Sequence, residues 1–314
     1  MAADPDSPSG RDEPRVIATL TADDAAHAHR LVDAATAADG VAPLSEQAVL
    51  AIDHTEPGVQ AGVRHVVSPA GYANITPGRS GEPAMIEAVV DPALRRRGHG
   101  RALLDAAFAA AREAAGAEDP APRAWAHGDL PGAVALAASM GLDRRRELLQ
   151  LRRRDPRTLP RLDVPSDIAL RTYAGTGDDA EILRVNNAAF AWHPEQGGWT
   201  AAQIRERVGA DWFDPAGLFL AFDADQDGAP TGDLLGFHWT KVAEPGLGEV
   251  YIVGVDPAAQ GRGLGRILTL AGLHYLADRG IGEVMLYVEG DNTAALHTYD
   301  RLGFTRYAVD VAYG

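Results

Sequence analysis

Positions of apolar residues recur at helical spacing in two stretches of the chain, at residues 103–111 and 267–276. Residues three and four positions apart share one face of a helix, so each stretch predicts a long amphipathic helix. The stripe positions are Leu103, Leu104, Ala107, Phe108 and Ala111 in the first stretch, and Ile267, Leu268, Leu270, Ala271, Leu273, His274 and Leu276 in the second.

Short apolar runs bounded by turn residues predict strands in the second half of the chain. An acidic, turn-rich segment at 223–228 separates the first two, and a helix over 292–302 is predicted between the last two. Strands mixed with helices in this way favour an α+β fold, in which helices flank a mixed, mostly antiparallel sheet. The predicted strands are Leu218–Phe222, Leu234–Lys241, Gly248–Val255, Glu283–Val288 and Phe304–Tyr313.

The chain contains an internal repeat. Residues 89–101 (VVDPALRRRGHGR) recur as residues 254–266 (GVDPAAQGRGLGR), each copy lying directly before one of the two predicted helices. Further along, the pairs Gly128-Asp129 and Gly141-Leu142 match Gly290-Asp291 and Gly303-Phe304 at the same separation. Two landmarks in register indicate two copies of one α/β domain.

Composition divides the chain further. Residues 1–15 are rich in Pro, Asp, Ser and Gly and predict a disordered tail, and three prolines at 156–165 predict a linker at residues 155–167. The two domains are therefore expected at residues 16–154 and 168–314.

Charge and cysteine content restrict the function. The net charge of −15 argues against binding to nucleic acid or to anionic membranes, and no apolar run is long enough to span a membrane. The absence of cysteine excludes disulfides, thiolate nucleophiles and cysteine-ligated metals, and it suits a cytoplasmic protein. No histidine pair has the spacing of a metal site, and no Gly-x-Ser-x-Gly motif of a serine hydrolase occurs.

The two repeated loops, residues 95–100 and 260–265, share the spacing Arg/Gln-x-x-Gly-x-Gly. Glycines let a backbone turn tightly with its N–H groups directed into one concavity, and the following helix adds the positive end of its dipole. The loops therefore predict two pyrophosphate cradles, of neither the Rossmann nor the Walker type. A plain glycine-rich turn is the alternative. The flanking cations are Arg96, Arg97 and Arg101 in the first copy and Arg262 and Arg266 in the second.

These loops, together with the segment 292–304, resemble the acetyl-CoA loop and the helix-plus-Gly-Phe signature of the GNAT acetyltransferase superfamily. The resemblance covers both halves and implies two tandem GNAT-like domains, acetyl-CoA as cosubstrate and no metal. Four segments, 39–47, 191–199, 236–241 and 248–260, are similar to the mycothiol synthases. These tandem GNAT enzymes acetylate the cysteinyl amine of cysteinyl-glucosaminyl-inositol, which gives mycothiol and CoA.

The repeat indicates which half performs chemistry. When Asp256 is aligned with Asp91, Ala84 stands opposite Glu249, and the aligned glycines place Ala137 opposite Tyr299. The second half is therefore expected to be catalytic. The first half keeps the phosphate loop and either binds acetyl-CoA or serves as a structural half.

Roles follow for residues of the second half. An α-amine is largely protonated at neutral pH, so Glu249 is the candidate general base, and Tyr299 is the candidate proton donor to the CoA thiolate. A strand-end carboxylate and a core aromatic are the ordinary alternatives. The predicted cofactor contacts are Val253, Gly254, Val255, Gln260, Gly261, Arg262, Gly263, Leu264, Gly265, Arg266 and Asn292, with Ala88, Val89, Val90, Arg96, Arg97, Gly98, His99, Gly100 and Arg101 in the first half.

The resemblance also implies contacts with a polyhydroxylated amine substrate, made by Glu46, Glu195, Lys241, Glu249 and Tyr287. Because Glu46 belongs to the first half, the substrate is expected in a cleft between the domains. Two other functions remain open: a tandem GNAT enzyme for an aminoglycoside or a protein N-terminus, and a non-catalytic acyl-CoA sensor. The sequence does not determine the oligomeric state, and a monomer is compatible with it.

Overall fold

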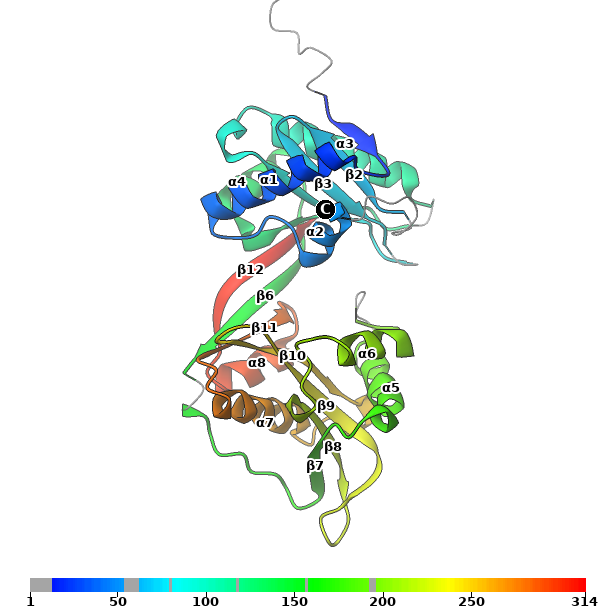
Figure 1. Cartoon of the computed structure of the whole chain (residues 1–314), viewed down its shortest axis with the longest axis vertical. Coiled ribbons are helices and arrows are strands. Elements are labelled where there is room, and N and C mark those ends of the chain that lie inside the picture. Colours follow the sequence, from blue (N-terminus) through cyan, green and yellow to red (C-terminus); the bar gives the residue numbers. More distant parts are fainter. Residues whose placement is uncertain (1–12, 54–61, 79–80, 117–118, 156–157, 192–195) are drawn as a thin grey trace, which may run out of the picture. The chain divides into compact units, whose positions relative to one another are not determined.

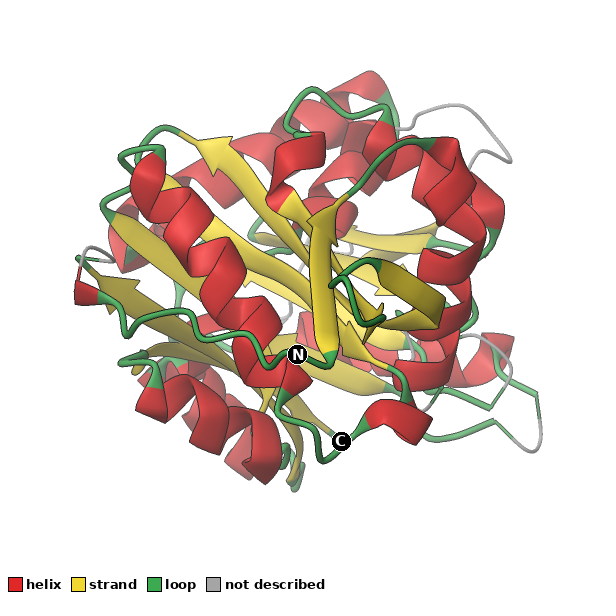
Figure 2. Ribbon diagram, turned by 90° about the horizontal axis from the view of Figure 1, so that it is seen from below, coloured by secondary structure: helices red, strands yellow, loops and turns green. Residues whose placement is uncertain are grey.

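The computed structural model describes residues 13–53, 62–78, 81–116, 119–155, 158–191 and 196–314 (Figure 1). Contacts divide the chain into a first unit, Met1–Glu147 with Val309–Gly314, and a second unit, Leu148–Ala308. Figure 2 shows strands with helices around them, and both units contain strands and helices, so the predicted α+β class is confirmed. In the described part of the chain, no helix is long and apolar enough to cross a membrane.

The first unit is built on one sheet with the order β1-β2-β3-β4-β5-β12, in which only β4 and β5 run parallel. Helices α1 and α2 pack on one face of the sheet, where Ile52 of α2 lies in the same core cluster as Val89 of β4. Helix α3 covers the other face through Leu103 and Phe108. The elements are β1 (Arg15–Ile17), α1 (Ala22–Asp39), α2 (Glu46–Asp53), β2 (Arg64–Ser68), β3 (Gly71–Thr76), β4 (Met85–Val90), α3 (His99–Ala114), β5 (Arg123–Ala126), α4 (Pro131–Ser139) and β12 (Thr305–Tyr313).

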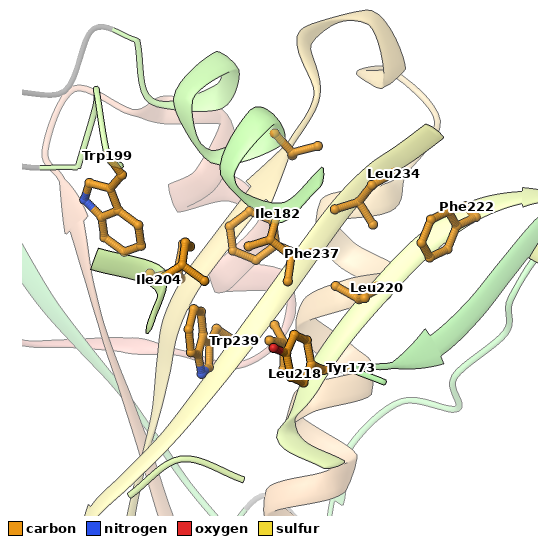
Figure 3. Close-up of a cluster of buried hydrophobic side chains, with 12 residues drawn as sticks. Tyr173, Ile182, Trp199, Ile204, Leu218, Leu220, Phe222, Leu234, Phe237 and Trp239 are labelled. Atoms are coloured by element: carbon orange, nitrogen blue, oxygen red, sulfur yellow. The ribbon is translucent and has the colours of Figure 1, made fainter. Parts of the chain in front are cut away.

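The second unit repeats this plan with the order β6-β11-β10-β9-β8-β7, and again one neighbouring pair, β10 and β11, is parallel. Figure 3 shows the core between this sheet and helices α5 and α6, where Trp239 and Phe237 are fully buried. Helix α7 packs on the sheet through Leu264 and Leu268. The elements are β6 (Arg144–Arg154), β7 (Ile168–Thr172), α5 (Asp179–Ala189), α6 (Ala201–Val208), β8 (Leu218–Ala224), β9 (Pro230–Glu244), β10 (Leu247–Val255), α7 (Leu264–Asp278), β11 (Glu283–Glu289) and α8 (Thr293–Arg301).

The two copies exchange their last strands. β6 ends the first copy in the sequence, yet it pairs with β11 of the second unit, while β12, at the end of the chain, pairs with β5 of the first unit. The contacts thus divide the chain at 147/148 and 308/309, whereas the sequence predicted one division at residues 155–167. Of the predicted tail, residues 1–12 lie outside the described residues, and Arg15 is the first residue of β1.

The predicted helices lie in α3 and α7, and every residue of their apolar stripes is buried except His274. That side chain instead places its Nε2 atom 2.9 Å from the carbonyl oxygen of Pro160. Helical spacing therefore identified the buried faces because each helix lies flat on a sheet.

Candidate active site

Parallel strands β10 and β11 separate in the middle of the second unit. Their pairing covers only residues 247–249 and 283–285 and ends at Glu249, while the other edge of β11 pairs with β6 over its whole length, 283–289. Among the described residues, one edge of β10 from residue 250 to residue 255 therefore has no strand partner. Backbone N–H and C=O groups need hydrogen-bond partners, so this edge can receive an extended ligand.

A β-bulge lies directly beyond this separation. Val250 pairs with Thr240 and Ile252 with Trp239, so Tyr251 is an extra residue on β10. Bulges turn neighbouring side chains and occur next to active sites. Here the bulge lies between the candidate base, Glu249, and the segment 253–255 that was predicted to bind the cofactor.

The loop after β10 has the geometry of an anion site. The Asp256 side chain accepts a hydrogen bond of 2.9 Å from the N–H of Ala258 and begins a short 3-10 turn. Gly261 and Gly263 then have φ angles of +84° and +74°, which favour glycine, and the second of them caps α7. A Cβ atom added to Gly261, Gly263 or Gly265 would have no heavy atom within 4 Å. The loop and the start of α7 therefore fit a pyrophosphate group.

The cations of this loop are not equivalent. Arg262 lies 3.1 Å from Asp167 and 2.8 Å from Asp223, so its charge is already paired within the unit. Arg266 is exposed and has no ion-pair partner in the described segments. Arg266 is thus the cation of this loop that is available to a phosphate without breaking an ion pair, and both residues remain predicted cofactor contacts.

The first unit has a loop of the same shape. Asp91 accepts a hydrogen bond of 2.9 Å from Ala93, and Gly98, with a φ angle of +88°, caps α3. Arg96 has a φ angle of +64°, at the position of Gly261 in the second copy. This conformation costs a non-glycine residue about 1–2 kcal/mol. Such strain is characteristic of ligand-binding segments. Arg95 itself forms a bidentate pair with Asp39, at 2.7 and 2.8 Å.

Glu249 and Lys241 stand directly opposite each other on β10 and β9. Side chains of such a pair lie on one face of the sheet and are close neighbours. The Lys241 ammonium lies 5.3 Å from the ring centres of both Trp212 and Tyr251. The predicted base and one predicted substrate contact are therefore brought together, beside two aromatic rings.

Asn292 is the N-cap of helix α8, and Tyr299 lies within that helix. The Asn292 side chain accepts a hydrogen bond of 3.1 Å from Ala295 and so caps the helix. Tyr299 packs edge-on against Phe304, with ring centres 5.7 Å apart, and burial raises the pKa of its hydroxyl to about 12. Tyr299 therefore keeps its proton at neutral pH, as a proton donor must.

The remaining substrate residues differ in their surroundings. Tyr287 is exposed on β11, and its hydroxyl oxygen accepts a hydrogen bond of 2.6 Å from Gln150. Glu46 is an exposed residue in the first turn of α2, in the first unit. Glu195 lies outside the described residues. The roles of these residues stay predictions.

The sheet register alters one sequence alignment. In the second unit, Val255 pairs with Gly236 and Glu249 with Lys241, five residues along β9. In the first unit, Val90 on β4 pairs with Gly71 on β3. Five residues further along β3 is Thr76, and its partner on β4 is Met85. Met85 rather than Ala84 therefore corresponds to Glu249, because the bulge adds one residue to β10. The first unit still has no carboxylate at that position.

Sequence reasoning missed a buried ionic network in the first unit. Glu87, 7% exposed on β4, lies 2.9 Å from Nε2 of His127, whose Nδ1 lies 3.2 Å from the Asp310 carboxylate on β12. A signal was present, because Glu87 is the one charged residue in the otherwise apolar strand Met85–Val90. Among the described residues, no group of three or more His, Asp or Glu side chains could hold a metal ion.

This network predicts a pH-dependent stability. Burial alone would lower the pKa of His127, but hydrogen bonds to Asp310 and Glu87 raise it to about 9, above the ordinary 6.5. A raised folded-state pKa stabilises the fold fully below pH 6.5, by about 3 kcal/mol, and this contribution is lost as pH rises through 9. The melting-temperature difference between wild type and His127→Gln should therefore be largest at pH 6 and shrink by pH 10. A difference that does not change with pH would contradict the assignment of a charged His127.

Comparison with known proteins agrees with these observations. The model of the acetyltransferase (GNAT) family matches residues 29–142 and 185–304. The fold is shared with a GCN5-related N-acetyltransferase from Sphaerobacter thermophilus (TM-score 0.70, 23% identity, 96% of this chain and 95% of that one). It is also shared with a tandem GNAT protein of the clavulanic acid biosynthesis pathway (TM-score 0.65, 22% identity, 96% and 98%).

Curated relatives are much more similar. The chain is 68% identical to a mycothiol acetyltransferase of Gordonia bronchialis over 98% of both chains. It is 55% identical to one of Rhodococcus erythropolis, over 94% of this chain and 97% of the relative. The chain therefore belongs to the GNAT acetyltransferase family and, within it, to the mycothiol acetyltransferases.

Proposed function

We propose that this acetyltransferase transfers the acetyl group of acetyl-CoA to the cysteinyl amine of cysteinyl-glucosaminyl-inositol, giving mycothiol and CoA. The observation that carries the proposal is the identity of 68% over nearly the whole length of a relative named mycothiol acetyltransferase. The separation of β10 and β11 and the glycine loop before α7 provide a site that suits this reaction.

Acetyl-CoA supplies a thioester whose acetyl group is transferred. The loop 260–265 and Arg266 would hold its pyrophosphate, and the unpaired edge of β10 would bind its extended arm. Backbone N–H groups within Val253–Val255 would donate hydrogen bonds to the developing oxyanion. The first unit, with the segments 88–90 and 96–101, would bind a second acetyl-CoA without transferring it.

Two side chains would accept and donate the protons of the reaction. The acceptor is an α-amine with a pKa of about 7.7–8.0, so most of it is protonated at neutral pH and has to lose a proton before attack. Glu249 would take this proton, directly or through a water molecule. Tyr299, which is protonated at neutral pH, would donate to the CoA thiolate.

The acceptor is rich in hydroxyl groups and carries an ammonium, so it needs charged and hydroxyl-bearing partners. Lys241 and Tyr287 would bind its polyol part, and Glu46 and Glu195 would accept from hydroxyl or ammonium groups. Trp212 and Tyr251 hold the Lys241 ammonium at 5.3 Å from each ring, which restricts where that charge can lie.

Replacing Glu46 tests the acceptor assignment. Loss of a charged hydrogen bond costs about 1.5–3 kcal/mol, so Glu46→Ala should raise KM for the acceptor roughly ten- to a hundredfold. The KM for acetyl-CoA should stay near that of wild type, as measured by steady-state kinetics. The neighbouring exposed Gln47→Ala is the matched control. A normal acceptor KM in folded Glu46→Ala protein would remove Glu46 from the binding site.

One assay separates the rival functions. Release of CoA is measured with acetyl-CoA and, in turn, cysteinyl-glucosaminyl-inositol, an aminoglycoside and a peptide with a free N-terminus. Turnover of the first alone supports the proposal. Preferred turnover of another amine would favour a different tandem GNAT activity, and binding of acetyl-CoA without any turnover would favour a sensor.

A further inference from the structure

Ser45, the residue before helix α2, is fixed by several hydrogen bonds. Ser45 caps this helix, because its Oγ accepts a hydrogen bond of 3.2 Å from Ala48 and its carbonyl oxygen accepts one of 3.0 Å from Val49. Glu46 is the first residue inside the helix and follows Ser45 directly. The position of the Glu46 backbone, from which its side chain extends, therefore depends on how Ser45 is fixed.

Glu87 fixes Ser45 through both backbone and side chain. One carboxylate oxygen accepts a hydrogen bond of 2.5 Å from the N–H of Ser45, and the other accepts one of 2.7 Å from its Oγ. These bonds join the first turn of α2 to strand β4. A serine cap satisfies a helix by itself, so the helix does not require Glu87 to form.

The Glu87 carboxylate is in turn held in place. It is 7% exposed, and a buried carboxylate is costly unless it is paired. His127 supplies the pairing at 2.9 Å and is itself held by Asp310 at 3.2 Å. Asp310 also accepts a hydrogen bond of 2.8 Å from the N–H of Gly128, which fixes the turn that carries His127.

Glu46 contrasts with this network. It is exposed, and within the described segments no hydrogen bond or ion pair engages its carboxylate. A carboxylate without a protein partner is available to a ligand, and because the backbone beside it is already fixed, binding has to order only the side chain.

We propose that Glu87, supported by His127 and Asp310, is a positioning residue that orients Glu46 toward the acceptor amine substrate. This inference rests on the proposed function, in which Glu46 binds the acceptor. Glu87 touches neither substrate nor cofactor in this assignment and acts only through Ser45 and the first turn of α2.

The test is a double-mutant cycle on the full-length enzyme, with cysteinyl-glucosaminyl-inositol as the varied substrate. Glu87→Gln keeps the shape of the side chain but leaves one accepting oxygen where two accept from the N–H and the Oγ of Ser45 in the wild type. We expect it to raise the acceptor KM about tenfold, with kcat and the KM for acetyl-CoA near wild type. In Glu46→Ala protein, Glu87→Gln should raise the acceptor KM no further. Glu113→Gln, an exposed change on α3, is the matched control.

The outcomes are distinct. If Glu46→Ala raises the acceptor KM and Glu87→Gln does not, or if the two effects multiply, the positioning role is wrong while the function of Glu46 stands. A normal KM in Glu46→Ala overturns both. If Glu87→Gln does not fold, Ser45→Ala is used instead; it removes the Oγ bond to Glu87 and the capping bond from Ala48, and leaves the backbone N–H bond to Glu87 in place. Its acceptor KM should rise and its amides at 45–49 should exchange hydrogen faster, and wild-type values of both would overturn the proposal.

Discussion

Glu249→Gln is expected to lower kcat by about 10²–10⁴-fold, because the amide cannot take the proton that the acceptor ammonium has to lose. The substitution preserves size, and the strand register around residue 249 does not depend on the carboxylate. Binding of acetyl-CoA, measured by calorimetry, should therefore stay near that of wild type. The decrease in kcat should become smaller at high pH, where more of the acceptor amine is already neutral.

Glu244→Gln is a suitable control, since Glu244 is the last residue of β9 and is exposed. A folded Glu249→Gln enzyme with unchanged kcat at neutral pH would exclude Glu249 as the general base. If acetyl-CoA affinity fell together with kcat, Glu249 would have a structural role in the cofactor site instead.

Gly265→Leu should abolish turnover by blocking the phosphate cradle. Gly265 lies in the first turn of α7 without a positive φ angle, and a Cβ there meets no atom within 4 Å, so the fold accommodates a side chain. The leucine would occupy the space in front of the loop N–H groups. Loss of two hydrogen bonds to a charged group, at about 1.5–3 kcal/mol each, corresponds to a 10²–10⁴-fold weaker affinity for acetyl-CoA. Equilibrium binding and initial rates measure both effects.

Gly263→Leu should have the same effect and an added loss of stability, because Gly263 has a φ angle of +74°. Gly282→Leu, at another open position, is the control for a generic glycine effect. In the first unit, Gly98→Leu should lower stability or cofactor binding there and leave turnover in folded protein. The halves would be assigned backwards if folded Gly98→Leu protein were inactive and Gly265→Leu protein were active.

Local sequence determined much of the candidate site. Residues 256–265 form a short turn, a loop and the start of a helix. All three are formed by residues that are adjacent in the sequence. The same is true of the loop at 91–100, where even Arg96 adopts the left-handed conformation. Glu249 was identified through its position on a strand before this motif, and Tyr299 through the helix that follows β11.

The tertiary structure decided how these parts are used. Alternation in residues 305–313 predicts a strand, but it does not specify that β12 joins β5 and brings Asp310 to His127. An arginine beside a glycine loop suggests a phosphate contact, yet Arg262 is paired with Asp167 and Asp223, which come from distant segments.

The sequence by itself thus determined the two copies, their helices and strands, the two glycine-rich loops and the family, since periodicity and turn chemistry depend on residues that are near each other in the chain. Only the tertiary structure decided which strands pair, which cations are already neutralised and which buried carboxylate holds the start of α2. Those properties depend on contacts between residues far apart in the chain, such as Ser45 with Glu87, 42 positions apart, and Gly128 with Asp310, 182 positions apart, and no local pattern encodes such partners.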